Sequence, residues 1–250
     1  MNDKPDRESA SHAEFAGDVR SMFDRIARRY DIANHLLSGG VDFHWRRVAV
    51  NMSNVNDGDQ LLDMCCGTGD LAFCFARHGT GLNQITGCDF SSEMIDIAKT
   101  KQKKLSSRSV TLKAQFDWVV GDCTKTHFED ESFDIVSCAF GVRNMADLDA
   151  GLSEMHRLLR KGGRACILEF SLPKLRLFRW AYLTYLRYIL PLLGGVLTGR
   201  LSAYRYFADS ILKWDTRIDL GKRLGIAGLT EIATRRLNFG IATVYVYKKP

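Results

Sequence analysis

Hydrophobic and polar positions change period repeatedly between about residue 60 and Phe170. Short apolar runs, which are typical of buried strands, alternate with segments whose apolar residues recur at helical spacing. This βαβ alternation predicts an α/β fold with a doubly wound, mostly parallel sheet and helices on both faces. The expected strands are 61–64, 85–88, 116–120, 133–140 and 164–170, and the expected helices are 70–77, 91–103 and 148–159.

The segments before this core have other patterns. Residues 1–17 are polar and mixed in charge, which predicts a disordered leader. Residues 18–58 predict a helical cap. In the cap, an apolar stripe runs from Val19 to Leu37, and a shorter helix follows the break at 38–40.

A helical insertion and a hairpin are predicted after the core. Residues 174–212 are rich in aromatic, leucine and arginine residues and are interrupted at 191–195. The runs 230–237 and 240–247 predict a hairpin that gives the sheet an antiparallel strand. Part of the insertion is amphipathic, and it fits either a core-packing helix or a helix on a membrane surface. Its apolar stripe consists of Leu175, Phe178, Tyr182, Leu186 and Ile189.

The composition favours an intracellular protein without disulfides or metal. The seven cysteines lie mostly in apolar runs and form no C-x-x-C pair, so we expect reduced thiols in a cytoplasmic protein. No two of the six histidines have metal-ligand spacing on one face, and no run of eighteen uncharged apolar residues predicts a membrane span. The net charge of +6 fits anionic lipid, nucleic acid or mere solubility.

The turn after the first expected strand is the best candidate for a ligand site. The strand ends near Asp63, and Gly67 and Gly69 flank Thr68 just before a helix, so backbone N–H groups face a ligand. Asp89, twenty residues past Gly69, closes the next apolar run. An acid at that position can accept both hydroxyls of a ribose, so these features predict an adenosine-containing cofactor.

The turn alone fits two classes of cofactor. A dinucleotide-binding turn favours a third glycine, and this chain has the permitted variant Ala72. Asp63 favours S-adenosylmethionine, because a carboxylate suits a sulfonium and an ammonium better than a pyrophosphate. The alternative without a cofactor is a plain strand–turn–helix connection with a solvated Asp63.

Longer motifs resemble one family. From about Val19 to Lys249 the chain resembles the ubiquinone/menaquinone biosynthesis C-methyltransferases, a class I S-adenosylmethionine-dependent group with a Rossmann-like fold. The resemblance implies a methyltransferase domain at 59–250 that carries the insertion. The motifs are FDxIAxxYDxxNxxxS at 23–38, FGVRN at 140–144, RxLxxGGR and LEFSxP within 157–173, and YRYFAxSI at 204–211.

The resemblance also implies a set of cofactor contacts. Thr68 and its neighbouring glycines would line the methionine end of S-adenosylmethionine, and Asp89 would bind the ribose. Asp122 and Cys123 would lie at the adenine. One contact position that is usually serine in the family is Ala139 here, so a hydroxyl contact is missing.

The implied reaction is C-methylation of a reduced prenylated demethylquinone, with 2-demethylmenaquinol as substrate and the ubiquinone-pathway 2-polyprenyl-6-methoxy-1,4-benzoquinol as the alternative. A ring carbon beside a phenolic oxygen becomes nucleophilic once that oxygen loses its proton. The protein must therefore align carbon, methyl and sulfur and stabilise the phenolate. No metal is required.

Three residues are candidates for this chemistry. Arg143 and Asn144 follow a buried strand at its carboxyl end, where open α/β sheets bind ligands. Because guanidinium stays protonated, Arg143 would stabilise the phenolate or polarise a water, and Asn144 would orient the same group. Tyr30 fits a hydrogen bond to the ring oxygens and packing beneath the N-terminal helices equally well. Glu169 fits a structural ion pair better than a role in positioning water.

The resemblance implies a prenylated hydroquinone as partner, and it is compatible with contact to the inner face of the membrane and with a homo-oligomer or biosynthetic complex. Two departures, 212–216 and Tyr245, are expected by the substrate end and leave the particular quinone open. A nucleic-acid methyltransferase is the rival class, but the chain lacks the Asn/Asp-Pro-Pro-Tyr/Phe run of the exocyclic-amine enzymes. A non-catalytic binding module fits the combined motifs poorly.

Overall fold

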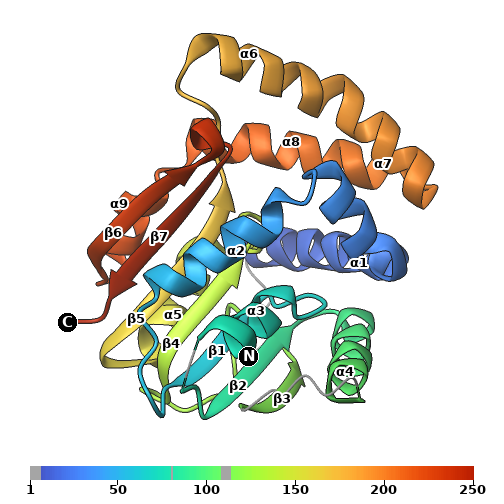
Figure 1. Ribbon diagram of the computed structural model, residues 1–250. Coiled ribbons are helices and arrows are strands. Elements are labelled where there is room, and N and C mark those ends of the chain that lie inside the picture. Colours follow the sequence, from blue (N-terminus) through green and yellow to red (C-terminus); the bar gives the residue numbers. More distant parts are fainter. Residues whose placement is uncertain (1–6, 80, 108–113) are drawn as a thin grey trace.

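The computed structural model describes residues 7–79, 81–107 and 114–250 (Figure 1). Its centre is a seven-stranded sheet in the order β3-β2-β1-β4-β5-β7-β6. Strands β1 to β5 pair in parallel, and β7 runs antiparallel to β5 and β6, which confirms the predicted sheet. The strands are β1 (Gln60–Met64), β2 (Gln84–Asp89), β3 (Gln115–Val120), β4 (Phe133–Ala139), β5 (Leu159–Phe170), β6 (Thr230–Leu237) and β7 (Ala242–Lys248).

Helices cover both faces of the sheet because each buries an apolar stripe against it. On one face, α2 (Val41–Met52) and α3 (Asp70–His78) pack against the sheet. On the other face lie α5 (Leu148–Leu158) and α9 (Leu220–Ile226). Helix α4 (Ser92–Ser107) packs against β2 and β3. At the start of α4, the Ser91 hydroxyl accepts the Met94 N–H at 3.1 Å and so caps the helix.

A helical layer lies beyond the carboxyl ends of the parallel strands (Figure 1). It consists of α1, α6, α7 and α8, with a five-residue π-helical turn, η2, between α6 and α7. An aromatic and aliphatic cluster that includes Tyr182, Leu186 and Tyr204 holds these helices together. A site at the strand ends is therefore enclosed between sheet and helices. The elements are α1 (Arg7–Leu37), α6 (Arg176–Thr184), η2 (Tyr185–Ile189), α7 (Leu190–Thr198) and α8 (Leu201–Arg217).

The structure corrects the predicted leader. Helix α1 begins at Arg7, so residues 7–17 are helical rather than disordered, and residues 1–6 lie outside the described residues. This stretch contains glutamate and several alanines, which favour helix, and its polar character suits an exposed helical surface as well as a disordered chain.

The predicted interruption at 191–195 is also wrong, because α7 runs through it. Pro191 stands in the first turn of the helix, where a missing N–H costs nothing. Gly194 allows α7 to approach α8, since a Cβ there would lie 2.3 Å from Cγ of Tyr204. The chain instead breaks at Gly199, whose φ of 74° is left-handed. Helix α5 ends at Leu158, one residue before its predicted end, and the glycines at 162–163 lie within β5.

The predicted C-terminal hairpin is confirmed. Strands β6 and β7 pair antiparallel, and the short turn η3 (Asn238–Gly240) joins them. Asn238 and Phe239 have φ values of 45° and 59°, which place two non-glycine residues in the left-handed region. This turn reaches the helical layer, where it meets α6.

Candidate active site

Asp89 ties the glycine turn to the end of β2. Its two carboxylate oxygens accept the Gly67 N–H at 2.8 Å and the Ser91 N–H at 3.0 Å. Burial raises the pKa of Asp89 to about 7, although these backbone bonds favour the ionised form. Asp89 therefore shapes the turn as well as facing the cavity that a ribose would occupy.

Asp63, at the end of β1, carries an unsatisfied oxygen. One carboxylate oxygen accepts the Ser137 hydroxyl at 2.7 Å, but the other is buried without a hydrogen-bond partner in the described part of the chain. Only 1 % of the residue is exposed, and burial raises its pKa to about 7. The predicted solvated alternative is therefore wrong, and the carboxylate is poised for a cation.

Two cavities meet at the strand ends. The first, of about 400 Å³, lies beneath α6 and is called the α6 cavity here. The second, of about 380 Å³, lies beside the ends of β2 and β3 and is called the β2–β3 cavity. They share a wall, so a ligand in one can reach a ligand in the other. The shared residues are Tyr30, Cys65, Gly67, Ala139 and Phe140.

The β2–β3 cavity holds the predicted ribose and adenine residues. Asp89, Asp122 and Cys123 all line it. The exposed Asp122 carboxylate accepts the Thr124 N–H at 2.8 Å, which fixes the loop after β3. Cys123 is buried, and its sulfur accepts the Cys65 N–H at 3.1 Å, which ties this loop to the glycine turn.

The α6 cavity is polar at one end and aromatic at the other. Asp63, Thr68 and Arg46 supply the polar end. The Nε of Arg46 is buried and has no hydrogen-bond partner among the described residues, although the other two guanidinium nitrogens pair with Asp42 and Asp70. The cavity therefore offers one unsatisfied carboxylate oxygen and one unsatisfied N–H donor. The aromatic end is lined by Trp45, Phe140, Phe170, Phe178, Tyr182, Tyr185, Phe207 and Phe239.

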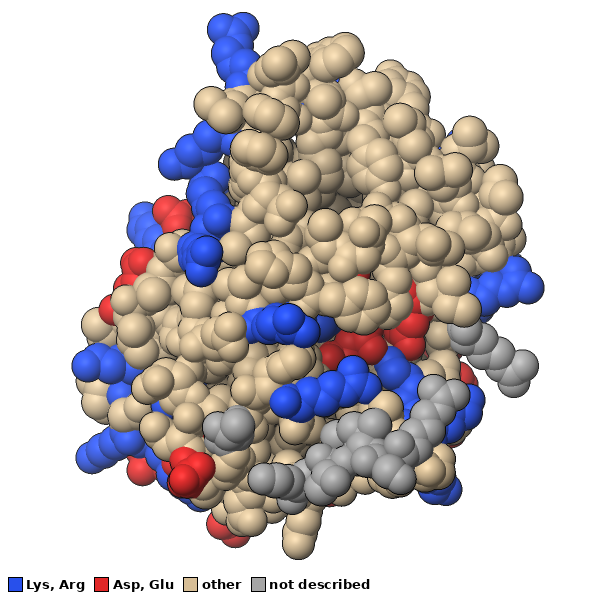
Figure 2. All heavy atoms as spheres, viewed as in Figure 1, with Lys and Arg blue, Asp and Glu red and all other residues tan. Residues whose placement is uncertain are grey.

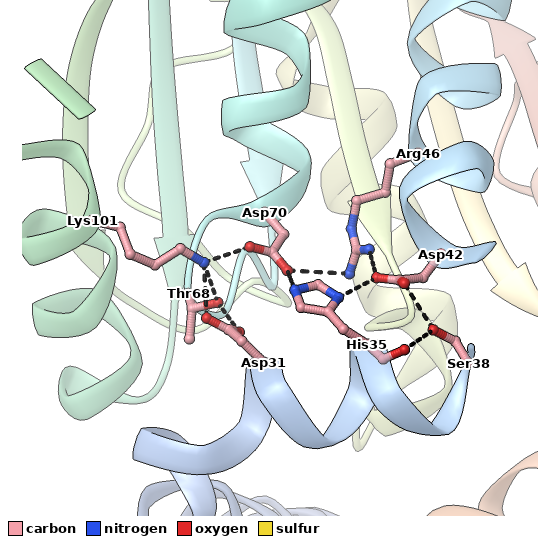
Figure 3. Close-up of polar contacts among 8 residues, drawn as sticks. All are labelled: Asp31, His35, Ser38, Asp42, Arg46, Thr68, Asp70 and Lys101. Atoms are coloured by element: carbon pink, nitrogen blue, oxygen red, sulfur yellow. Dashed lines mark hydrogen bonds and ion pairs between the residues drawn. The ribbon is translucent and has the colours of Figure 1, made fainter. Parts of the chain in front are cut away.

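A charged network joins the helical cap to the glycine turn (Figure 3). Lys101 of α4 binds Asp31 of α1 at 2.9 Å, Thr68 at 3.1 Å and also Asp70. The Thr68 hydroxyl donates to Asp31 at 2.5 Å. Thr68 is thus held by α1 and α4.

The second half of this network centres on His35 (Figure 3). Its Nδ1 lies 2.6 Å from Asp42 and its Nε2 lies 3.5 Å from Asp70, while Arg46 pairs with both carboxylates. The bond to Asp42 raises the pKa of His35, so the imidazolium form is favoured. Little in the sequence indicates this network. Asp42 and Arg46 stand four residues apart on a helix, but their partners are distant in the chain.

Arg143 is engaged within the protein. Its guanidinium lies 2.9 Å from Glu169, also donates to the Phe140 carbonyl, and is 2 % exposed. It sits 5.2 and 5.1 Å from the ring centroids of Phe170 and Phe207. Arg143 lines neither cavity, so the geometry makes it a positioning residue behind the aromatic wall, and Glu169 forms the expected structural ion pair.

Tyr30 and Asn144 do face the cavities. Tyr30 belongs to the shared wall, and Asn144 lines the β2–β3 cavity, where its Oδ1 accepts the Tyr206 hydroxyl at 3.2 Å. Burial raises the pKa of Tyr30, while the charges of Arg143 and Arg46 act in the opposite direction. The Tyr30 hydroxyl is therefore a protonated donor beside two cations.

Other predicted residues fall outside the cavity walls. Gly69 lines neither cavity, and its φ of 84° lets the chain pass Trp118, whose ring a Cβ would meet at 2.6 Å. Its role is conformational. Tyr245 on β7 and residues 212–216 of α8 also lie off both walls, so these departures do not border the substrate end as expected.

The described residues hold neither a metal-binding cluster nor a membrane-spanning helix. No cluster of three or more histidine, cysteine, aspartate or glutamate side chains there could hold a metal ion. None of the helices in residues 7–79, 81–107 and 114–250 is long and apolar enough to cross a membrane.

Comparisons with solved structures support the fold. The chain matches a SAM-dependent methyltransferase from Aquifex aeolicus with a TM-score of 0.58 at 13% identity, covering 82% of this chain and 89% of that one. A likeness at this identity establishes the architecture alone.

Sequence relatives are closer. The chain is 40% identical over 231 residues to a ubiquinone/menaquinone biosynthesis C-methyltransferase UbiE from Geotalea uraniireducens, covering 92% of this chain and 96% of the relative. It is 37% identical to a demethylmenaquinone methyltransferase from Bacteroides fragilis, covering 92% of each chain. The model of the ubiE/COQ5 methyltransferase family matches residues 9–249. The chain belongs to the ubiE/COQ5 methyltransferase family and is an S-adenosylmethionine-dependent C-methyltransferase.

Proposed function

We propose that this protein methylates a ring carbon of a reduced prenylated demethylquinone, with 2-demethylmenaquinol as the substrate. The observation that carries the proposal is the wall shared by the β2–β3 cavity, which holds the predicted ribose and adenine residues, and the α6 cavity, whose far end is aromatic. The names of the relatives support the same reaction. The ubiquinone-pathway benzoquinol remains the alternative, since it offers the same ring C–H and tail.

Residues of both cavities fit S-adenosylmethionine. Asp89, Asp122 and Cys123 would hold the adenosine in the β2–β3 cavity. The unsatisfied oxygen of Asp63 and the unsatisfied Nε–H of Arg46 would pair with the ammonium and the carboxylate of its amino-acid end. A dinucleotide would leave this acid–base pair unused. The bound cofactor supplies the methyl group.

The chain itself binds and orients the quinol. The aromatic residues of the α6 cavity would hold the ring and exclude water, which strengthens polar contacts inside. Tyr30 would donate to the ring oxygen beside the reacting carbon and stabilise its phenolate. Arg143 would support that charge through space and hold Phe140 and Phe170 in place, through the Phe140 carbonyl and its contact with the Phe170 ring.

We further propose that one surface docks on an anionic membrane. The α6–α7 face is defined by the exposed residues Leu177, Trp180, Tyr188, Leu192 and Val196. Figure 2 shows this part, at the top of the view, as a broad uncharged surface with a basic side chain at its upper left edge. Between Glu169 and Asp209 the sequence has six basic residues and no acidic one. This combination suits anionic lipid.

The exposed face is not the predicted stripe. Tyr182 and Leu186 of that stripe are buried in the core, whereas Leu175, Phe178 and Ile189 are exposed. We therefore propose lipid contact through the α6–α7 face, on the opposite side of α6 from Tyr182.

The reaction is tested with reduced and oxidised quinones. The product mass and the methyl position by NMR should show a new ring C–CH₃ from demethylmenaquinol, and the oxidised quinone should be inert because its ring carbon is electron-poor. An O-methyl product, or activity only on RNA, would refute the proposal. Faster turnover of the benzoquinol would favour the alternative substrate.

The membrane contact has a separate test. Serine at Leu177, Trp180 and Val196 together should abolish sedimentation with anionic vesicles while cofactor binding by calorimetry persists. Serine at Ile226 and Ile232, which are also exposed but lie on α9 and β6, is the matched control. An equal loss of vesicle sedimentation in both variants would show that the α6–α7 face is not the docking surface.

A further inference from the structure

Two phenylalanines from distant parts of the chain close one wall of the α6 cavity. The rings of Phe178 on α6 and Phe239 in η3 stack at a centroid distance of 4.2 Å and an interplanar angle of 10°. Both rings line the cavity, yet they are 41% and 65% exposed. The pair therefore faces the interior on one side and the outer surface on the other.

Other parts of the same wall are filled. Tyr182 and Leu190, which line the cavity, are buried in the cluster that joins α1, α7 and α8. The Tyr185 hydroxyl donates to the Leu37 carbonyl at 2.6 Å and closes the junction between η2 and the end of α1. At the glycine turn the cavity shares lining residues with the β2–β3 cavity. Among the described aromatic residues that line this cavity, Phe178 and Phe239 are thus the exposed ones, and the exposed Ala181 and Asn238 lie on the same wall.

Hydrogen bonds fix the backbone around the pair. The Ser171 N–H donates to the Ile241 carbonyl at 2.9 Å, and its hydroxyl donates to the Gly240 carbonyl at 2.7 Å, so the start of the α6 connection is bound to η3. The Trp45 Nε1–H donates to Asn238 at 2.7 Å. This frame holds Phe239 at its left-handed φ of 59°, a conformation that costs a non-glycine residue free energy.

The outer side of the pair adjoins the α6–α7 face. Leu177 and Trp180, which flank Phe178 on α6, are 73% and 68% exposed. A chain that leaves the cavity between the two rings passes directly onto apolar surface. A polyisoprenoid tail fits this route, because it is long, flexible and apolar, and because the aromatic cavity cannot enclose more than its first units.

We propose that Phe178 and Phe239 form the portal through which the prenyl tail leaves the α6 cavity, so that this pair sets the preference for long-tailed substrates. The inference rests on the proposed function and deepens it. The rings separate by side-chain rotation and then contact the tail on both sides.

Kinetics with substrates of different tail length test the portal. The measured quantity is the ratio of kcat/KM for a long-tailed demethylnaphthoquinol to that for its tailless analogue, in detergent. Phe239→Ala and Phe178→Ala should each lower this ratio about tenfold through KM, the factor that corresponds to roughly 1.4 kcal/mol of lost apolar contact. Ile232→Ala, an exposed apolar position on β6 that lines neither cavity, should leave the ratio unchanged. An unchanged ratio in both phenylalanine variants would overturn the portal.

Photolabelling gives a result that does not depend on methyl transfer. A quinol with a diazirine on its second isoprene unit should label peptides that contain Phe178 and Phe239 in the wild-type protein. Labelling confined to α7 and α8 would overturn the portal even if methylation proceeds. Labelling at the pair without any methyl transfer would refute the proposed reaction and leave the portal standing.

Discussion

Replacing Asp63 with asparagine separates cofactor recognition from folding. The amide keeps the shape and can still accept the Ser137 hydroxyl, but it removes the charge of the buried carboxylate. If that carboxylate holds the cofactor ammonium, S-adenosylmethionine should bind more weakly by roughly 1.5–3 kcal/mol, the scale for a hydrogen bond to a charged group. 5′-Methylthioadenosine lacks the amino-acid end, so its affinity should not change.

The pKa of Asp63 makes the same prediction depend on pH. Burial raises that pKa from 3.8 to about 7. Below pH 7 the group must first lose a proton to hold an ammonium, so affinity for S-adenosylmethionine should fall by up to about tenfold per pH unit. Titration calorimetry in buffers of different ionisation enthalpy should detect a proton released on binding near pH 6. Asp63→Asn should release fewer protons on binding, because Asp63 no longer contributes. The protons that this variant still releases should come from Asp89, whose pKa is also about 7.

Stability should move in the opposite direction. A raised carboxyl pKa means that the folded state binds the proton more tightly, so stability falls as pH rises from about 4 to 7. Holding Asp63 ionised above pH 7 costs roughly 4 kcal/mol as an upper bound. Asp63→Asn should therefore be at least as stable as wild type at pH 8, in thermal unfolding.

Two results would refute the assignment of Asp63 to the cofactor ammonium. One is an unchanged affinity of Asp63→Asn for S-adenosylmethionine, and the other is an equal loss of affinity for methylthioadenosine.

Three other variants test separate parts of the structure. Arg143→Lys keeps the charge but not the planar fork that binds Glu169. We therefore expect normal cofactor affinity by calorimetry and a loss of most turnover. A wild-type rate on the quinol would remove Arg143 from the mechanism. His35→Gln should lower the free energy of unfolding in urea by roughly 1–2 kcal/mol below pH 6. This difference from wild type should shrink as pH rises through the raised pKa of His35, because the imidazolium loses its charge. A difference that does not depend on pH would contradict the ionised network. Gly194→Ala should destabilise the protein by about 1–3 kcal/mol because its methyl group meets the Tyr204 ring. A melting temperature equal to that of wild type would show that α7 can move away from α8, which would contradict the close contact.

Local pattern determined much of the fold and one part of the site. The strands, the hairpin at 230–247 and the serine start of α4 follow from periodicity and short-range hydrogen bonds, which act between residues close in sequence. The glycine turn and Asp89 were recognisable for the same reason, because parallel strands bring their carboxyl ends to one edge. The longer motifs indicated the family, which the comparisons confirm.

Tertiary packing decided the rest. Gly194 and Pro191 resemble helix breakers along the chain, but close contact with α8 and a first-turn position make both compatible with α7. Arg143 has the sequence context of a group facing substrate, yet a buried Glu169, which needs a cation, holds it behind the aromatic wall. The unsatisfied oxygen of Asp63 and the unsatisfied Nε–H of Arg46 arise only when distant elements exclude water from both. Sequence spacing cannot encode such desolvation, because it depends on which other segments cover the group.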